Sequence, residues 1–336
     1  MTRHLWPQIF LVSLVLGFAF PYSYAASYQY IRLGQKADVQ THPSPGIAMM
    51  GGGSDLDETF RWLCKKANGG DFLVLRARGD DAYNPYVNGL CKLNSVATLI
   101  VPDRDAAQDP AVAEIIRHAE VLFIAGGDQA RYVNFWRGTP VQNAINANLA
   151  AGKPIGGTSA GLAVLGEFAY GALGDAPDDE DLSSSDVLRD PYFGRVTLVR
   201  GLLANPSLSG VLTDSHFAQR DRMGRSLGFL ARIMQDAWSA TPREIAIDEG
   251  SAVLLEADGR TTVVGPGKGA YFLRPTQAPE VCQPKTPLTF RNITVYQTPA
   301  GAHFDISKWS GEGGVSYSLS VEQGVIHSTQ LGGSIY

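Results

Sequence analysis

The chain has 336 residues, of which 44% are hydrophobic and 18% charged, and its formal net charge is −5 at pH 7. This composition is ordinary for globular proteins and excludes disordered and fibrous repeat proteins. The mildly acidic balance argues against a general nucleic-acid-binding protein, which would normally present a basic face.

The first 25 residues have the features of a secretory signal peptide. A short positive start at Arg3 precedes an apolar run over residues 9–20, and the small residues Ser23 and Ala25 precede the expected cleavage point. A membrane anchor is the alternative, but the apolar run is shorter than the roughly 20 residues that a spanning helix needs. We therefore expect a secreted or periplasmic protein that leaves the membrane after signal cleavage.

After a polar lead-in segment, residues 26–45, short apolar runs alternate with stretches of helical spacing. Strands and helices that alternate over short connections predict an α/β fold, a parallel sheet with helices on both faces. The expected strands are residues 47–50, 72–75, 97–101, 121–125, 154–157, 211–213, 245–247 and 253–256, and the expected helices are 55–66, 111–119, 142–151, 162–168 and 222–235.

Two regions depart from this alternation. Residues 175–181 are strongly acidic and are typical of a solvated surface loop, with a site for a cation or cationic substrate as the alternative. Near the C-terminus only strand-like runs occur, at residues 290–296 and 315–321. We therefore divide the mature chain into an α/β domain, 46–278, and a small C-terminal β extension, 279–336.

The chain contains three cysteines, Cys64, Cys91 and Cys282. A disulfide is permitted in an exported protein, and an odd count leaves at least one cysteine without a partner in the chain. We expect Cys64 to pair with Cys91 because both lie in the N-terminal half, and three buried thiols are the alternative. No CxxC spacing indicates a metal site, and Asn292 begins a glycosylation triplet that matters only in a host that glycosylates.

The strongest chemical signal is the pentapeptide Gly157-Thr158-Ser159-Ala160-Gly161, which lies between an apolar strand and an apolar helix. GxSxG in this setting is a nucleophile elbow, in which glycines permit the sharp turn that exposes the serine hydroxyl. The first N–H groups of the following helix can stabilise an oxyanion. Ser159 is therefore the predicted nucleophile.

A serine nucleophile needs a base, and His216 is the best candidate because it follows a strand at the end where catalytic residues gather. A capping or surface histidine is the structural alternative, and an esterase that uses His303 or His327 as its base is a functional one. The third member of a triad would be a carboxylate, and Asp248 and Glu249 both follow the strand at residues 245–247. The pattern alone does not choose between these two acids.

Two further clusters carry polar groups to strand ends. Arg220, Arg222 and Arg225 follow the candidate base, and arginine forks match carboxylates, although a solvated helix face has the same pattern. Gly126-Gly127-Asp128-Gln129 follows the strand at 121–125, where a Gly-Gly turn lets backbone N–H groups approach a ligand or a phosphate. A Rossmann fingerprint is absent.

Four blocks occur in one order, and together they resemble the cyanophycinase-like serine peptidases of family S51 over residues 46–275. The blocks are residues 124–129, 157–161, 214–225 and 247–249. The resemblance implies a flavodoxin-like fold similar to class I glutamine amidotransferases. It also implies a triad in the order Ser159, His216 and Glu249, which selects Glu249 over Asp248 and differs from the Ser-acid-His order of α/β-hydrolases.

The same resemblance implies an exopeptidase that hydrolyses β-linked aspartyl peptides and uses no metal or cofactor. The implied oxyanion donors are Gly127 and Ala160, and the implied substrate-binding residues are Gln129, Asp214, Arg220, Arg222 and Arg225. Ser215 stands where cyanophycinases commonly carry glutamine, which leaves cyanophycin and small isoaspartyl peptides as alternative substrates. A non-catalytic binding protein on the same fold, and a monomer or a homodimer, remain open alternatives.

Overall fold

The computed structural model describes residues 1–2, 27–174 and 181–336. Residues 3–25 of the predicted signal peptide and residues 175–180 of the acidic segment lie outside the described residues. In the part of the chain that is described, none of the helices is both long and apolar enough to span a membrane.

The larger of two sheets has ten strands. Five central strands run parallel to one another, and every other pairing in this sheet is antiparallel. In spatial order the strands are β1 (Gln29–Gly34), β4 (Ser95–Ile100), β3 (Asp71–Arg76), β5 (Val121–Ile124), β6 (Ile155–Thr158), β2 (Gly46–Met50), β11 (Ala252–Glu256), β12 (Arg260–Val264), β15 (His303–Asp305) and β16 (Ser310–Glu312).

The second sheet has eight strands, of which β9 runs parallel to both β10 and β7. In spatial order they are β18 (Val325–Ser328), β17 (Val315–Glu322), β14 (Phe290–Thr298), β13 (Ala270–Pro275), β10 (Arg243–Ile247), β9 (Val211–Asp214), β7 (Phe168–Tyr170) and β8 (Leu198–Arg200).

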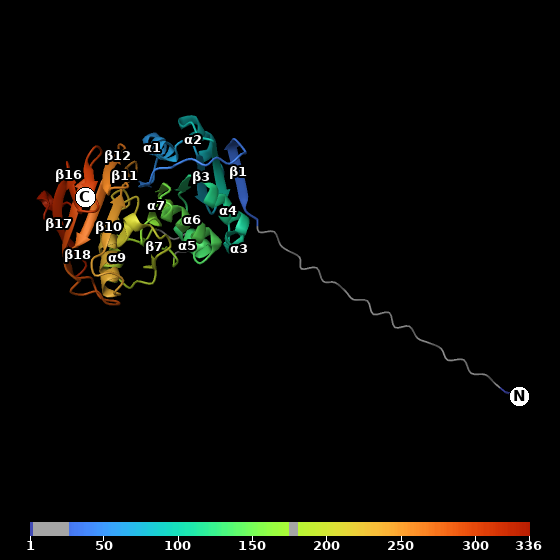
Figure 1. The fold of residues 1–336 in the computed structure, drawn as a ribbon. Coiled ribbons are helices and arrows are strands. Elements are labelled where there is room, and N and C mark those ends of the chain that lie inside the picture. The colour runs from blue at the N-terminus through green and yellow to red at the C-terminus, as the bar shows by residue number, and fades with distance from the viewer. Residues whose placement is uncertain (3–26, 175–180) are drawn as a thin grey trace.

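Helices cover both faces of the parallel strands, as the alternating pattern predicts (Figure 1). The helices are α1 (Asp57–Ala67), α2 (Tyr83–Leu90), α3 (Arg104–Gln108), α4 (Pro110–His118), α5 (Gln129–Trp136), α6 (Pro140–Ala150), α7 (Ala160–Ala163), α8 (Ser184–Arg189) and α9 (Met223–Gln235). Because side chains alternate along a strand, Phe72 and Val74 of β3 pack with α1 and α2, while Leu73 and Leu75 pack with α3 to α6. Such strands are buried on both sides and therefore appear as continuous apolar runs.

The lead-in segment and the C-terminal segment both contribute strands to the sheets of the α/β domain, which their composition does not indicate. The lead-in segment contains β1, which pairs antiparallel with β4 at the edge of the first sheet. The strands of the expected C-terminal extension join both sheets: β14 pairs with β13, and β15 pairs with β12. Phe304 of β15 stacks on Phe272 of β13 at 3.8 Å between ring centroids, so residues 279–336 share a core with the rest of the protein.

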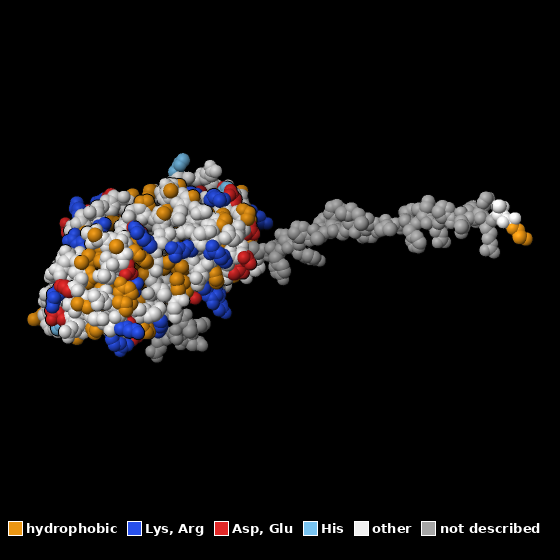
Figure 2. Space-filling model, turned by 90° about the horizontal axis from the view of Figure 1, so that it is seen from below, with side chains coloured by type: hydrophobic (Ala, Val, Ile, Leu, Met, Phe, Trp, Pro, Cys, Tyr) orange, Lys and Arg blue, Asp and Glu red, His pale blue; other side chains and the backbone are white. Residues whose placement is uncertain are grey.

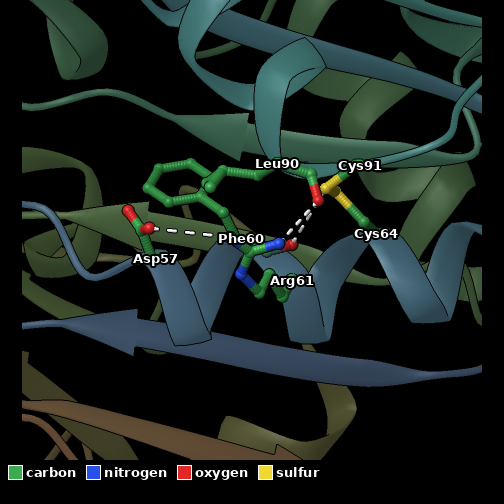
Figure 3. The surroundings of a disulfide bond; sticks show 6 residues. All are labelled: Asp57, Phe60, Arg61, Cys64, Leu90 and Cys91. Carbon is green, nitrogen blue, oxygen red and sulfur yellow. Dashed lines mark hydrogen bonds and ion pairs between the residues drawn. A yellow bond between two sulfur atoms is a disulfide. The ribbon is translucent and has the colours of Figure 1, made fainter.

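The expected disulfide is present, because Cys64 of α1 is bonded to Cys91, which follows α2 (Figure 3). Arg61 of the same helix donates to the carbonyl oxygen of Leu90 at 2.9 Å, which adds a second link between the two helices. Cys282 is a buried free thiol.

On the face shown in Figure 2, lysine and arginine side chains are interspersed with apolar and acidic ones.

Candidate active site

Ser159 lies in a sharp turn between β6 and α7, with φ 52° and ψ −118°. A non-glycine residue with positive φ is strained, and it is the backbone conformation expected of a nucleophile elbow. The neighbouring glycines make the turn possible, because a Cβ on Gly161 would lie 2.0 Å from the Ile124 carbonyl oxygen and one on Gly157 would lie 2.5 Å from the Gly161 oxygen.

The helix after the nucleophile is shorter than the sequence predicts. Residues 160–163 are helical, whereas the expected helix over 162–168 gives way to β7 at Phe168. The buried Thr213 hydroxyl donates to the Leu162 carbonyl at 2.9 Å and accepts from the Gly166 N–H at 3.2 Å. A side chain from β9 thus satisfies the helix end, and the chain turns into the second sheet.

Three side chains form a hydrogen-bonded relay at the meeting point of the two sheets. The Ser159 hydroxyl lies 2.7 Å from Nε2 of His216, and Nδ1 of His216 lies 2.5 Å from Oε1 of Glu249. His216 follows β9 and Glu249 follows β10, so adjacent parallel strands deliver the imidazole and the carboxylate. The neighbouring Asp248 carboxylate accepts instead from the Gln219 backbone N–H at 2.8 Å.

The loop after β2 packs closely against the imidazole of His216, a contact that the sequence analysis did not predict. The Gly51 carbonyl accepts from the His216 backbone N–H at 2.8 Å. A Cβ on Gly52, where φ is +95°, would lie 2.3 Å from the His216 ring. Three consecutive glycines at residues 51–53, directly after a strand, are the sequence signal of such a close approach.

The surroundings of His216 favour its neutral form. The side chain is 9% exposed, and burial lowers the pKa of the imidazole below its ordinary value. The hydrogen bond to Glu249 raises the pKa, while Arg220 and Arg222 lower it further. A neutral imidazole with Nδ1 held by a carboxylate can accept a proton from the serine hydroxyl at Nε2.

Two backbone N–H groups lie next to the nucleophile. Ala160 is the first residue of α7, so its N–H has no acceptor within its own helix. Gly127 follows β5 with φ +138°, a conformation that glycine readily adopts. A Cβ on the adjacent Gly126 would lie 3.4 Å from that of Ser159, which shows how closely the two strand ends approach. Backbone N–H groups at strand and helix ends of this kind can stabilise an oxyanion.

Ser159 and His216 open into a cavity of about 730 Å³. All the other residues that the resemblance assigns to substrate or oxyanion, namely Gly127, Gln129, Ala160, Asp214, Arg220, Arg222 and Arg225, line this cavity. Within the described ranges no three His, Cys, Asp or Glu side chains are grouped as metal ligands would be.

Arg225 has its carboxylate partner inside the protein. Its Nε lies 2.9 Å from Oδ2 of Asp214 and its Nη2 lies 2.6 Å from Oδ1, a bidentate pair. The two side chains are 2% and 4% exposed, and the guanidinium also lies over the Tyr170 ring. Burial raises the pKa of Asp214, but Arg225 and Arg222 outweigh it and hold that pKa below its ordinary value. This arrangement makes Arg225 a support of the cavity wall.

Asp181, at the end of the acidic segment, contacts the other two arginines of the cavity. Its Oδ2 lies 2.7 Å from Nη2 of Arg222 and 3.1 Å from Nη1 of Arg220. Burial raises the pKa of Asp181, yet Arg222 and Arg220 together lower it to about 2. Asp181 therefore contacts the arginines of the cavity, while its own side chain is 49% exposed. Any substrate carboxylate that reaches these two arginines must share them with Asp181.

Comparison with known proteins shows which family the chain resembles in sequence. The family model described as Peptidase family S51 matches residues 87–188. Cyanophycinases of Synechococcus elongatus and Thermosynechococcus vestitus are each 31% identical over 239 residues, 66% of this chain and 66% of theirs. The cyanophycinase of Trichormus variabilis is 28% identical over 220 residues, 63% of this chain and 65% of its own.

Among solved structures, a peptidase from an acI-B1 Actinobacterium is 18% identical with a TM-score of 0.46, covering 68% of this chain and 91% of that one. The chain spans about two thirds of the length of the cyanophycinases that it matches. The chain belongs to peptidase family S51.

Proposed function

We propose that the protein is a secreted serine exopeptidase that hydrolyses β-linked aspartyl peptides. The observation that carries the proposal is the relay from Ser159 through His216 to Glu249, with distances of 2.7 and 2.5 Å. Each atom lies where general-base activation of a serine requires it.

In the proposed reaction the Ser159 hydroxyl attacks the scissile amide carbonyl while His216 accepts its proton at Nε2. The carbonyl oxygen becomes an oxyanion that the N–H groups of Gly127 and Ala160 stabilise. His216 then gives the proton to the leaving amine, and the amide C–N bond breaks to leave an acyl-enzyme. Water, deprotonated by the same imidazole, hydrolyses the ester and regenerates the serine.

The names of the relatives and the charge of the cavity support the proposed substrate class. The matched relatives are named cyanophycinases. The cavity carries the guanidinium groups of Arg220 and Arg222, which suit a substrate with a free carboxylate next to the scissile bond. Gln129 completes the proposed substrate-binding set, and Asp214, which is 4% exposed and paired with Arg225, supports the cavity wall. Cyanophycin and small β-aspartyl peptides both meet these requirements.

Export is proposed from the signal-peptide pattern of residues 1–25. The disulfide between Cys64 and Cys91 supports it, because stable disulfides belong to oxidising compartments. Mass spectrometry of the protein recovered from outside the cytoplasm should find an N-terminus at Ala26, and an intact N-terminal segment on that protein would contradict cleavage.

The decisive experiment combines labelling with turnover. A fluorophosphonate should label the wild-type protein and the control Ser307→Ala, which changes an exposed serine of the second half of the chain, but not Ser159→Ala. In a panel of α- and β-linked aspartyl peptides, wild type and Ser307→Ala should cleave the β-linked members, and Ser159→Ala should cleave none. Turnover by Ser159→Ala would exclude the mechanism.

Two other functions have distinct outcomes in the same experiment. A non-catalytic binding protein would bind peptides without labelling or turnover. An esterase based on His303 or His327 would survive His216→Ala. However, His303 lies on β15, where its ring contacts the Thr261 carbonyl at 3.1 Å, whereas His216 contacts the nucleophile. Loss of activity in His216→Ala would exclude that esterase.

A further inference from the structure

The cavity lining carries an excess of positive charge although the protein is acidic. Its described lining contains six arginines and three aspartates, whereas the whole chain has a net charge of −5. Clefts lined by one sign of charge concentrate ligands of the opposite sign. The excess of guanidinium groups therefore indicates a substrate with more than one negative group.

Half of these arginines form a wall that comes from the second sheet. Arg220, Arg222 and Arg225 follow β9, and each is paired with Asp181 or Asp214 as described above. The other half are Arg76, the last residue of β3, Arg78 in the loop that follows, and Arg131 of α5. None of these three has a role in the proposed reaction.

Within the second wall the three guanidinium groups are engaged differently. Nε of Arg131 lies 3.3 Å from Oδ2 of Asp128. Arg76 donates to the Arg78 carbonyl at 2.7 Å and to the Asp80 carbonyl at 2.8 Å. The Arg78 side chain has no hydrogen-bond or ion-pair partner among the described residues, and Arg78 is exposed. Among the described residues that line the cavity, Arg78 thus offers a guanidinium group without a protein partner to a ligand.

The loop that carries Arg78 is held in place by its own residues. The Arg76 side chain donates hydrogen bonds to the carbonyl groups of the residues on both sides of Gly79. Gly79 has a φ of +120°, which glycine readily adopts. A Cβ at Gly79 would lie 2.2 Å from Nη2 of Arg76, so a larger residue would disrupt these two hydrogen bonds. The backbone of Arg78 is therefore fixed before a ligand arrives, which lowers the entropic cost of binding.

The sheet order gives the distance between this loop and the nucleophile. β3 and β6 are separated by β5, so with about 4.8 Å between neighbouring strands the loop after β3 begins about 10 Å from the turn that carries Ser159. An extended peptide advances about 3.3 Å per residue, so about three residues cover this distance.

We infer that Arg78 forms an anion subsite for a second carboxylate of the substrate, about two to three residues from the scissile bond. The inference rests on the proposed function, since it assigns a preference to the same cavity. Its consequence is that acidic oligopeptides bind better than β-aspartyl dipeptides. The carboxylate need not belong to cyanophycin, because the subsite recognises charge and position.

The test measures binding separately from catalysis. Two pairs of peptides differ only in one carboxylate: β-Asp-Gly-Asp-amide against β-Asp-Gly-Asn-amide, and Asp-Gly-β-Asp-Gly-amide against Asn-Gly-β-Asp-Gly-amide. Calorimetry on Ser159→Ala should show tighter binding of the member with the additional acid in at least one pair. Adding Arg78→Gln should weaken that member about fivefold, the size of one charge-assisted contact at an exposed site, and leave its amide partner within twofold.

Arg137→Gln is the matched control, because Arg137 is also an exposed arginine but does not line the cavity. It removes the same charge and should change neither peptide, and Arg78→Lys should restore part of the preference. The subsite would be overturned if Arg78→Gln weakened the binding of both members of each pair equally. It would also be overturned if Arg137→Gln caused the same selective loss of binding to the more acidic peptide. Failure of all four peptides to bind would overturn it as well.

The proposed function can fail independently. If wild type hydrolyses none of the four peptides while the Arg78-dependent preference persists in Ser159→Ala, the subsite stands and the peptidase proposal falls. If wild type hydrolyses both members of each pair with equal kcat/KM and Arg78→Gln does not alter that ratio, the peptidase proposal stands and the subsite falls.

Discussion

Replacing Arg225 by methionine distinguishes a supporting residue from a substrate-binding one. The change leaves Asp214, which is 4% exposed, without its bidentate partner. Removing one member of a buried ion pair costs about 3–5 kcal/mol, because the remaining charge is neither solvated nor paired. Arg222 remains 3.5 Å from Asp214, so we expect the lower end, about 3 kcal/mol.

The assay is urea denaturation at pH 7 of wild type, Arg225→Met, Asp214→Leu and the double variant. The double variant should lose less than the sum of the single losses, because it leaves no unpaired charge from this pair. Arg260→Met is the surface control, since Arg260 is 76% exposed and should show no measurable change. If Arg225→Met unfolds like wild type and only raises KM, the guanidinium binds substrate and the supporting role is refuted.

Three further predictions follow from burial and linkage. His216 must be neutral to act as a base, and burial lowers its pKa, so kcat/KM should rise with pH with a midpoint below 6.5, and a midpoint above 6.5 would contradict the buried relay. Burial, reinforced by Asp214, raises the pKa of Glu244 well above its ordinary value, so the wild-type carboxyl must take up a proton on folding above pH 4.5. The unfolding free energy of Glu244→Gln relative to that of wild type should therefore rise between pH 5 and 7, by up to about 1.4 kcal/mol per pH unit. A relative free energy that does not change with pH would show that the buried carboxyl is charged. Replacing Cys64 and Cys91 by serine should lower the unfolding free energy by about 3.5 kcal/mol, from the 27-residue separation that the disulfide closes, and an unchanged denaturation midpoint would argue against that linkage in solution.

Strands that are buried on both faces were predictable from the sequence, whereas a strand at the edge of a sheet was not. Residues 72–75 and 121–125 appear as apolar runs because both faces of the parallel sheet are covered. β1 escaped detection because it is an edge strand with exposed and half-buried side chains, which leaves no apolar pattern. The shortened helix at Ala160–Ala163 depends on Thr213, some 50 residues away, which no local pattern contains.

The residues of the candidate site also divide into those that a local sequence pattern predicts and those that it does not. Ser159 and His216 were predictable because strand, turn and helix signals are local to each residue. The pairing of Arg222 with Asp181 spans 41 residues in sequence, and charge patterning alone describes both as solvated. Arg78 was not singled out, because its significance comes from a cavity that β3 and β6 form together and from the partners that the neighbouring arginines have.

The C-terminal segment shows why residues remote in sequence belong in the account of catalysis. The chain between the proposed base and α9 contains two non-glycine residues with positive φ, His216 at 48° and Asp221 at 49°. Each costs about 1–3 kcal/mol, which contacts with the surroundings must offset. Tyr336 supplies such surroundings: its hydroxyl donates to Asp221 at 3.0 Å and accepts from the Met223 N–H at 2.7 Å. Its ring meets the buried Phe217 edge-on at 5.8 Å. Residues 279–336 therefore contribute contacts to the loop that begins at the imidazole, although the relay itself is formed by residues from other parts of the chain.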